Sequence, residues 1–323
     1  MPSSHGDFPM KVLLTGASGF IGTALGARLV AHGFDVIGVG RRMPNTPVPG
    51  VYYRTVGELG TSTDWCEALL GVQAIIHCAA RVHAMCDQAQ EPLAEFRRTN
   101  VEGTLNLARQ AASAGVRRFI FLSSVKVNGE RGHFTEADFP APQDAYSISK
   151  YEAELGLLEI AAKIGIEVVI IRPPLVYGPR VRANFLLLLR AVARGIPMPF
   201  GAIHNRRSLV ALDNLLDFIT TCLSHPAAAN QTFLVSDGED LSTTELIRRM
   251  AHALGCSARL IPVPIPLLRA TATLLGKQEA AARLCQSLRV NITKAQKMLG
   301  WTPPVSVDEG LRRTAEDYLL SQE

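Results

Sequence analysis

Hydrophobic and polar positions follow two different periods in the first half of the chain. Short apolar runs rich in β-branched residues predict strands at 11–16, 35–40, 51–56, 74–80, 117–124 and 166–174. Stretches with helical spacing separate most of them, at 19–33, 64–71, 92–115 and 144–165. Nearly continuous apolar strands that alternate with helices are typical of a parallel sheet covered on both faces. The first half therefore predicts an α/β fold with a doubly wound parallel sheet of the Rossmann type.

The pattern changes after about residue 180, where proline becomes frequent. Loops and short β segments separate the remaining helical runs, which cover 184–195, 213–224, 243–255 and 307–320. We expect a first domain over 10–180 and a smaller, mostly helical C-terminal lobe over 181–323, with some strands and helices interleaved. Residues 1–9 show neither period, and we expect a disordered N-terminal extension there.

The composition limits the kinds of molecule that we expect this protein to bind. The chain of 323 residues is 47% hydrophobic and 19% charged, as in an ordinary globular protein. Its net charge of +4 comes from arginines scattered without a basic tract, so we expect an anionic small molecule and no nucleic acid. No stretch approaches the length of an apolar transmembrane segment, and the N-terminus lacks the apolar core of a signal peptide. The six cysteines show no metal-type spacing, so we expect no metal site, reduced thiols and a cytoplasmic location.

A glycine-rich turn follows the first strand. In "TGASGFIG" the glycines are Gly16, Gly19 and Gly22, and a helix begins directly after the turn. A bound dinucleotide needs a tight turn, a backbone without Cβ beside its pyrophosphate, and free N–H groups at a helix N-terminus. The spacing is G-x-x-G-x-x-G, which differs from the common G-x-G-x-x-G. We predict a dinucleotide site that includes Phe20 and Ile21; the alternative is a purely structural glycine turn.

The end of the second strand bears on the choice of cofactor. It ends in Gly40, Arg41 and Arg42, where an NAD-specific protein usually has a carboxylate for the ribose. Arginine would pair with the 2′-phosphate of NADP, whereas two merely solvated arginines would leave NAD as the cofactor. We therefore expect NADP or NAD. Glu58 and Leu59 follow the third strand and are expected to border the adenine.

Three residues form a candidate catalytic group. Ser124 ends the strand over 117–124, and Tyr146 and Lys150 open the following helix four positions apart, on one face. A phenol with a pKa of about 10 is a poor base, but a nearby ammonium and the positive nicotinamide ring lower that pKa. Tyr146 can then exchange a proton with a sugar hydroxyl or carbonyl while hydride moves. Ser124 would hydrogen-bond the same oxygen, and Lys150 would also hold the nicotinamide ribose. The alternative is a strand-end serine and a solvated helix face.

Eight motifs occur in order along nearly the whole chain: "TGASGFIG", "HCAA", "TNVEGTLNLARQA", "LSSVKVNG", "YSISK", "RPPLVYGP", "RRSLVALDN" and "LGWTPP". With these motifs the sequence resembles the extended short-chain dehydrogenase/reductase family, the group of NAD-dependent nucleotide-sugar epimerases, dehydratases and reductases. The resemblance implies an N-terminal dinucleotide-binding domain, a C-terminal lobe that binds a UDP-sugar, and a homodimer.

The resemblance also implies roles for individual residues. The family's glycines and its catalytic serine, tyrosine and lysine fall on the residues named above. The further cofactor-binding positions are Ala79, Ala80, Asn100 and Pro173. The substrate-binding positions are Ser124, Lys126, Asn184, Arg207 and Arg283. Asn184 and the two arginines would contact the diphosphate, although Arg283 is equally acceptable as a surface residue.

Departures from the family pattern narrow the reaction. Family dehydratases place Asp-Glu directly after the catalytic hydroxyl residue, whereas this chain has Val125 and Lys126, so we do not expect 4,6-dehydration. Leu175 replaces a frequent asparagine, which puts one substrate contact in doubt. The "RVH" after "HCAA" is similar to bacterial enzymes of surface polysaccharide biosynthesis that reduce a UDP-4-keto-6-deoxy-N-acetylhexosamine at C4.

Our first interpretation is therefore an NAD(P)-dependent 4-keto-sugar reductase acting on a UDP-sugar. The alternative is a UDP-glucose or UDP-N-acetylglucosamine 4-epimerase with tightly bound NAD. A non-sugar reductase of the same fold and a redox-sensing regulator are more distant. The diphosphate-facing arginines argue against a non-sugar reductase. The presence of both Tyr146 and Lys150 argues against a regulator.

Overall fold

The computed structural model describes residues 9–82, 92–274, 276 and 278–322, so most of the predicted N-terminal extension lies outside the described residues. The chain forms two compact units that exchange segments. The first comprises Met1–Val127, Pro142–Arg172 and Ile219–Phe233, and the second comprises Asn128–Ala141, Pro173–Phe218 and Leu234–Glu323. The division of the chain into domains at residue 180 stays a prediction.

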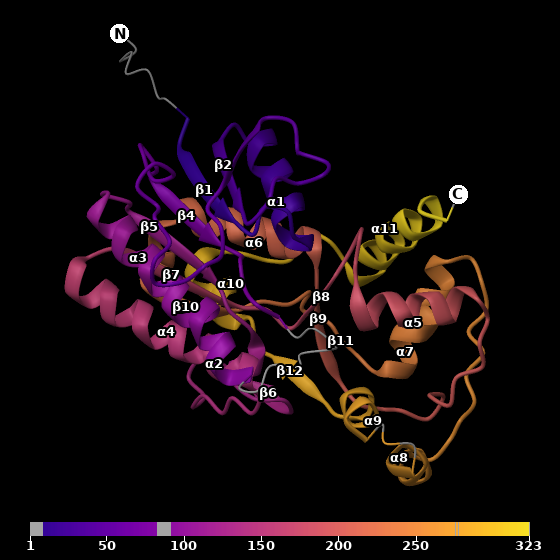
Figure 1. The fold of residues 1–323 in the computed structure, drawn as a ribbon. Coiled ribbons are helices and arrows are strands. Elements are labelled where there is room, and N and C mark those ends of the chain that lie inside the picture. Colours follow the sequence, from indigo (N-terminus) through magenta and orange to yellow (C-terminus); the bar gives the residue numbers. More distant parts are fainter. Residues whose placement is uncertain (1–8, 83–91, 275, 277, 323) are drawn as a thin grey trace. The chain divides into compact units, whose positions relative to one another are not determined.

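The first unit is built on a seven-stranded sheet with the order β10-β7-β5-β4-β1-β2-β3 (Figure 1). Its strands are β1 (Lys11–Thr15), β2 (Asp35–Gly40), β3 (Val51–Thr55), β4 (Ala74–His77), β5 (Arg118–Leu122), β7 (Glu167–Arg172) and β10 (Gln231–Leu234). The pairs from β3 through β7 are all parallel. The strand order reverses between β1 and β4, which is where doubly wound sheets bind ligands. The predicted fold class is confirmed.

Helices pack on this sheet through small and branched side chains. They are α1 (Phe20–Ala31), α2 (Pro92–Phe96), the π-helical segment η1 (Arg97–Glu102), α3 (Gly103–Ser113) and α4 (Ala145–Ile164). The short 3-10 segments η2 (Val125–Val127) and η3 (Pro226–Ala228) and the helix α6 (Leu212–Ser224) follow along the chain. Leu107 and Ala111 of α3, and Leu157 of α4, share one buried core with Phe119 and Val168 of the sheet.

The helix predicted over 64–71 is wrong. The structure has consecutive turns there, with Leu69 donating to the Trp65 carbonyl at 2.9 Å and Val72 donating to Leu69 at 3.1 Å. Trp65 and Leu69 are nevertheless buried in the core of the first unit, because four residues of turn bring both side chains to the same side. The apolar spacing correctly indicated that the two side chains share a face, but the backbone between them is not a continuous helix.

The second unit contains several helices, as predicted, and it also has a smaller sheet. The sheet follows the path β11-β9-β12-β6, and β8 pairs with β9. Its strands are β6 (Gly132–Phe134), β8 (Leu175–Tyr177), β9 (Arg207–Ala211), β11 (Asp240–Leu241) and β12 (Leu288–Val290). Its helices are α5 (Ala183–Ala193), α7 (Thr243–Ala253), α8 (Ile265–Leu274), α9 (Gln278–Cys285), α10 (Thr293–Leu299) and α11 (Val307–Leu320).

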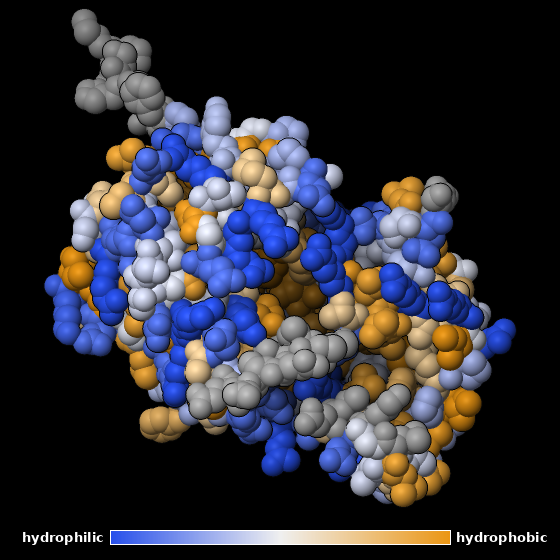
Figure 2. Space-filling view, in the orientation of Figure 1, coloured by the Kyte–Doolittle hydropathy of each residue, from blue (hydrophilic) through white to orange (hydrophobic). Residues whose placement is uncertain are grey.

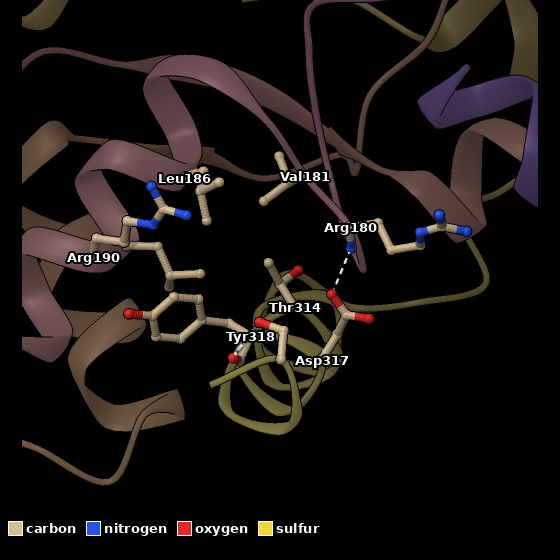
Figure 3. Close-up of a pocket in the computed structure, with 9 residues that line it drawn as sticks. Arg180, Val181, Leu186, Arg190, Thr314, Asp317 and Tyr318 are labelled. Carbon is tan, nitrogen blue, oxygen red and sulfur yellow. Dashed lines mark hydrogen bonds between the residues drawn. The ribbon is translucent and has the colours of Figure 1, made fainter. Parts of the chain in front are cut away.

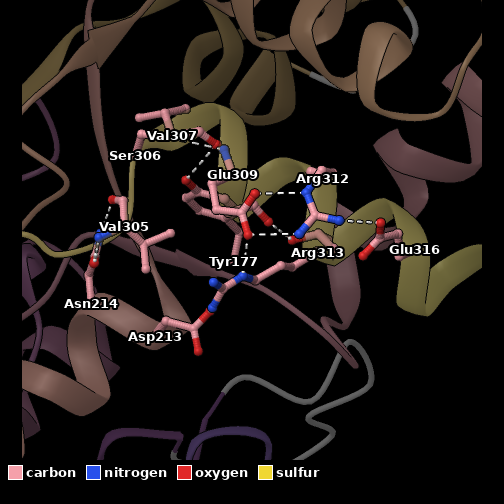
Figure 4. Close-up of polar contacts among 12 residues, drawn as sticks. Tyr177, Asp213, Asn214, Val305, Ser306, Val307, Glu309, Arg312, Arg313 and Glu316 are labelled. Carbon is pink, nitrogen blue, oxygen red and sulfur yellow. Dashed lines mark hydrogen bonds and ion pairs between the residues drawn. The ribbon is translucent and has the colours of Figure 1, made fainter.

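The "LGWTPP" motif leads into α11, and polar contacts anchor this part of the second unit (Figure 4). Asn214 of α6 exchanges two 2.8 Å hydrogen bonds with the backbone of Val305. Arg313 of α11 donates to Asp213 at 2.9 Å and to Glu309 at 2.7 Å. Trp301 donates its indole N–H to Asp217 at 2.9 Å. Trp301 therefore anchors the motif to α6 within the second unit.

Among the described residues, no helix combines the length and the apolarity that a membrane span requires.

Candidate active site

The glycine turn after β1 has no room for side chains. Gly16 has a φ of 67°, and a Cβ there would lie 2.9 Å from the Ala79 nitrogen at the end of β4. A Cβ on Gly22 would lie 2.1 Å from the Gly16 carbonyl oxygen, which is far inside van der Waals contact. The turn closes when Gly19 donates its N–H to Gly16 at 2.9 Å. These contacts explain the glycines at positions 16 and 22, and a Cβ on Gly19 would lie 3.2 Å from the Gly16 carbonyl oxygen.

The N-terminus of α1 is open toward a ligand. Gly19 is its N-cap and offers no side-chain cap, and its first turn, which contains Phe20 and Ile21, has no acidic residue. Uncapped N–H groups at a helix N-terminus bind phosphate well. Together with a turn that only glycine fits, this cradle suits the pyrophosphate of a dinucleotide. The residues present therefore fit an NAD-type cofactor.

A buried histidine connects the ends of β1 and β4. His77 is hydrogen-bonded to the Thr15 hydroxyl at 2.7 Å and to the Thr104 hydroxyl at 3.0 Å, and Thr15 also accepts the Ala79 N–H at 3.1 Å. Burial, together with the Lys150 charge, lowers the pKa of His77 to about 3. His77 is thus neutral at physiological pH and holds the strand end that carries Ala79 and Ala80. The sequence analysis missed it, although a histidine inside an apolar run was a signal.

Asn100 lies in η1 and joins the same strand end to α4. Its side chain accepts the Arg81 N–H at 2.7 Å and donates to the Arg81 carbonyl at 3.1 Å. The side-chain amide thus bonds both backbone groups of Arg81, as the backbone of a neighbouring strand would. It also donates to the Ser149 hydroxyl at 3.0 Å. Ser149 in turn donates to the carbonyl of Tyr146 at 2.7 Å. Asn100 therefore fixes the backbone on the predicted cofactor side and steadies the first turns of α4.

The N-terminus of α4 is capped by Asp144, which accepts the Ser147 N–H at 2.7 Å and forms a capping box with it. Lys126 donates to Asp144 at 2.5 Å, and its backbone N–H donates to the Ser124 hydroxyl at 3.3 Å. Burial favours a raised pKa for Asp144, but the bonds from Lys126 and Ser147 outweigh it and lower the pKa to about 2. These contacts bring the residues after β5 to the turn that carries Tyr146.

Tyr146 and Lys150 lie one turn apart on α4, as predicted. Lys150 is only 1% exposed, and its Nζ lies 3.9 Å from the ring centroid of Phe121. Burial lowers the pKa of Lys150 to about 7, although Glu154 and Cys78 favour its charge. Burial, with the Asp144 charge, raises the pKa of Tyr146 to about 12. Without a cofactor the tyrosine is therefore a phenol beside a lysine that titrates near neutrality.

A buried ion pair lies directly behind this lysine and was not predicted. Glu154, one turn after Lys150, accepts from Arg172 of β7 at 3.0 Å and 2.5 Å. Its side chain is 2% exposed and that of Arg172 is 7% exposed. Ser123, the neighbour of Ser124, donates its hydroxyl to the same carboxylate. The group connects β5, β7 and α4 below the predicted catalytic residues.

The other predicted cofactor residues differ in their exposure to solvent. Arg41 and Arg42 are exposed at the end of β2. Glu58 is exposed and pairs with Arg98 at 3.4 Å, whereas Leu59 packs against the core of the first unit. Pro173 is buried directly after β7. None of these placements decides the predicted roles, which stay predictions.

Two of the predicted substrate residues meet in the second unit. Arg207 of β9 donates its guanidinium to the backbone carbonyl of Arg283 and, at 3.4 Å, to that of Gln286. Burial lowers the pKa of Arg207. Asn184 is exposed in the first turn of α5. The structure thus brings Arg207 and Arg283 together and places Asn184 on a separate helix.

A cavity of about 330 Å³ in the second unit lies elsewhere, between α5 and α11 (Figure 3). Its lining includes Leu189, Arg190 and Tyr318, and the backbone N–H of Arg180 donates to Asp317 at 2.6 Å on its rim. No predicted site residue lines this cavity, so we assign no role to it. Within the described part of the chain, no three His, Cys, Asp or Glu side chains gather as a metal site would require.

The chain is similar to known proteins over almost its whole length. The model of the NAD dependent epimerase/dehydratase family matches residues 12–236. A UDP-glucose 4-epimerase of Vibrio cholerae is 45% identical over 316 residues, which cover 96% of each chain. The N-acetyl-alpha-D-glucosaminyl-diphospho-ditrans,octacis-undecaprenol 4-epimerase of Escherichia coli O157:H7 is 28% identical over 95% of this chain and 94% of that protein. Among solved structures, MoeE5 in complex with UDP-glucose and NAD is 27% identical with a TM-score of 0.77, covering 97% of this chain and 100% of that one.

These comparisons confirm the resemblance and the nicotinamide cofactor that the sequence analysis expected. They favour the epimerase alternative over our first interpretation, the 4-keto-sugar reductase, because the similar proteins include 4-epimerases and a complex with NAD.

Proposed function

Because the chain belongs to the NAD-dependent epimerase/dehydratase family, we propose that it is a UDP-hexose 4-epimerase with UDP-glucose as a substrate and NAD retained between turnovers. The observation that carries the proposal is the 45% identity to a UDP-glucose 4-epimerase over 96% of both chains. The Tyr146–Lys150 pair on α4 supports it, because the reaction needs an acid/base beside a hydride acceptor.

In this proposal Gly16, Gly19 and Gly22 cradle the pyrophosphate at the N-terminus of α1. Ala79 and Ala80 line the passing strand end that Asn100 and His77 hold in place. NAD held in this cradle would supply reversible hydride transfer at C4 of the sugar. All other steps fall to the side chains of this protein.

Tyr146 exchanges the proton of the C4 hydroxyl. Its pKa of about 12 without cofactor is too high for a base at neutral pH, so the Lys150 ammonium and the positive nicotinamide must lower it. Ser124 orients the same oxygen through its hydroxyl. Lys126 bonds both the Ser124 hydroxyl and Asp144, the N-cap of the helix that carries Tyr146, and so links the two catalytic segments.

The sugar diphosphate meets positive charge in the second unit in this proposal. Arg207 and Arg283 supply two guanidinium groups linked through the Arg283 backbone, and Asn184 adds an amide. Guanidinium forks suit diphosphate oxygens. A homodimer through 91–114 and 144–164, and a cytoplasmic location, remain proposals that rest on the family resemblance and on the cysteine pattern.

The second candidate is the 4-keto-sugar reductase. One observation favours it: Arg41 is exposed at the end of β2, where a 2′-phosphate of NADP would be read. In that case Arg41→Ala weakens the binding of NADPH far more than that of NADH. Equal losses for both cofactors contradict this role of Arg41.

The test is to incubate the purified protein with UDP-glucose and no added cofactor, and to follow UDP-galactose by NMR. The proposal predicts interconversion to equilibrium, with about one NAD released per chain on denaturation. Tyr146→Phe should retain the bound NAD and lose activity by about 10²- to 10⁴-fold. Activity that requires added NADPH would support the reductase instead.

A further inference from the structure

Four charged side chains are buried among the described residues, namely Arg118, Lys150, Glu154 and Arg172. Hydrophilic side chains are otherwise common on the surface of the first unit (Figure 2). Arg118 is bound by Glu167 at the start of β5, with a donor distance of 2.8 Å. The other three belong to α4 and the end of β7, so Glu154 is the one buried carboxylate in the described part of the chain. Burying a charge costs free energy even when it is paired.

Glu154 joins three segments of the first unit. Arg172, the last residue of β7, donates to its carboxylate at 3.0 Å and 2.5 Å. The Ser123 hydroxyl, directly after β5, donates to the same carboxylate. Ser123 immediately precedes Ser124, and Glu154 lies one turn after Lys150 on the same side of α4. One carboxylate therefore fixes the segments that carry two of the predicted catalytic residues.

Lys150 depends on this carboxylate for its charge. Within the described residues its ammonium makes no hydrogen bond, and its Nζ lies over the ring of Phe121. The other titratable groups that act on it are His77, which ends β4, and Cys78, which follows. His77 is neutral, and burial raises the pKa of the Cys78 thiol to about 12, so neither is charged at pH 7. Glu154 is thus the anion that supports the Lys150 ammonium.

The remaining charged groups around α4 are engaged elsewhere. The elements packed against this helix are α2, η1, η2, α3 and β7. Their charged groups besides Arg172 are Glu95 of α2, which pairs with Arg81 and Arg98; Arg97 of η1, which pairs with Glu152; the exposed Glu102 of η1; Lys126 of η2, which pairs with Asp144; Arg109 of α3, which acts on Glu159; and Glu167 of β7, which pairs with Arg118. None of these groups replaces Glu154 beside Lys150.

We propose that Glu154 is a positioning residue of the active site, whose carboxylate, fixed by Arg172 and Ser123, keeps Lys150 an ammonium beside Tyr146. The consequence for catalysis rests on the proposed function, in which Tyr146 acts as a base only with positive charge nearby. The buried pair then has a use that its stability alone does not explain, since buried ion pairs contribute little net stability compared with apolar residues.

The experiment follows the titration of Lys150 in the cofactor-stripped protein by NMR, with ¹³C at the Cε of every lysine. The chain has seven lysines, and the Lys150 signal is the one that Lys150→Met lacks. In E154Q/R172M we expect a midpoint at least about one pH unit below that of the parent, because a nearby opposite charge favours the charged form. Urea unfolding should show that this double variant is more stable than Glu154→Gln. A lowered midpoint then reports the missing charge and not damaged packing.

Glu154→Gln alone is the second variant, for the case that the double variant does not fold. Its midpoint should fall at least as far, because the Arg172 guanidinium loses its counterion. The matched control is Glu159→Gln, whose partner on α4 is the exposed Lys163. This control should titrate like the parent. The inference is overturned if Lys150 keeps its midpoint without Glu154, or if Glu159→Gln shifts it equally.

The pH profile of kcat/KM with UDP-glucose is the second readout. Its alkaline limb should move to lower pH in E154Q/R172M by about the shift seen by NMR, since Lys150 loses its proton earlier. A limb that stays in place while the midpoint moves contradicts the role of Glu154 in catalysis. The NMR titration needs no substrate, so a parent that fails to convert UDP-glucose contradicts the proposed function, whereas an unchanged midpoint contradicts the role of Glu154.

Discussion

At the scale of single residues, the sharpest prediction concerns how the burial of Lys150 makes the stability of the fold depend on pH. Its pKa of about 7 in the folded protein lies below its ordinary value of 10.5. The unfolded chain therefore binds one more proton than the folded chain between these two pH values, so the folded state gains stability as the pH rises across the window. Below pH 7 both states are protonated and the penalty is constant.

Lys150→Met should therefore stabilise the cofactor-stripped protein at neutral pH. Glu154 keeps its partner Arg172 in this variant, so no new buried charge is left alone. The advantage of the variant over the parent should shrink by on the order of 4 kcal/mol between pH 7 and pH 10.5. Urea unfolding at a series of pH values measures it. A difference that does not change with pH would contradict the pKa shift.

A second residue-scale prediction concerns the pair behind that lysine. Glu154→Gln leaves Arg172 buried without its counterion, which should cost about 3–5 kcal/mol of unfolding free energy. The double variant E154Q/R172M should recover much of this loss. Glu159→Gln is the control, because its partner Lys163 is 70% exposed and such pairs contribute at most about 1 kcal/mol. Equal losses at both sites would show that burial does not strengthen the Glu154 pair.

Single residues also show which parts of the site can be predicted from the sequence and which cannot. The spacing of Tyr146 and Lys150 places them on one helical face, and the motifs along the rest of the chain single them out. Glu154 and Arg172 could not be found, because their contact requires knowing how α4 lies on β7. Lys126 was expected to bind substrate, but its contact with Asp144 depends on the turn after β5, which no local pattern specifies.

At the scale of elements, the turn between β1 and α1 is the most constrained. Gly22→Ala would place a Cβ 2.1 Å from the Gly16 carbonyl oxygen and must displace the turn. We expect this variant to lose its NAD. Gly26→Ala, one turn later in α1, meets only side-chain methyl groups, of Val51 at 3.3 Å and Leu14 at 3.6 Å, and should retain NAD. The nucleotide released on denaturation measures both, and retention by Gly22→Ala would contradict the cradle.

Elements were predictable where the period is long and continuous. Six strands of the first unit, and helices such as α4 and α11, lie where the sequence predicted them. The pattern over 64–71 was too short to separate a helix from successive turns, since both bring residues four apart to one side. The π-helical segment that presents Asn100 has no sequence signal of its own.

At the scale of the whole molecule, the exchange of segments between the two units was beyond local patterns. Residues 219–233 lie in sequence between two segments of the second unit but belong to the first unit, where β10 pairs beside β7. Residues 128–141 show the opposite case. Such pairings join segments far apart in the chain, so they depend on the complete sheet order. The doubly wound order itself was predictable, because alternating strands and helices allow few alternatives.

The central claim is that the protein removes hydride from a sugar and returns it to the same sugar. The most direct measurement uses UDP-glucose with deuterium at C4, without added cofactor, and locates the label by NMR and mass spectrometry. The account predicts UDP-galactose with nearly all of the deuterium still at C4, because the cofactor stays bound through each turnover. Loss of the label from the product, or no product until NADPH is supplied, would contradict it.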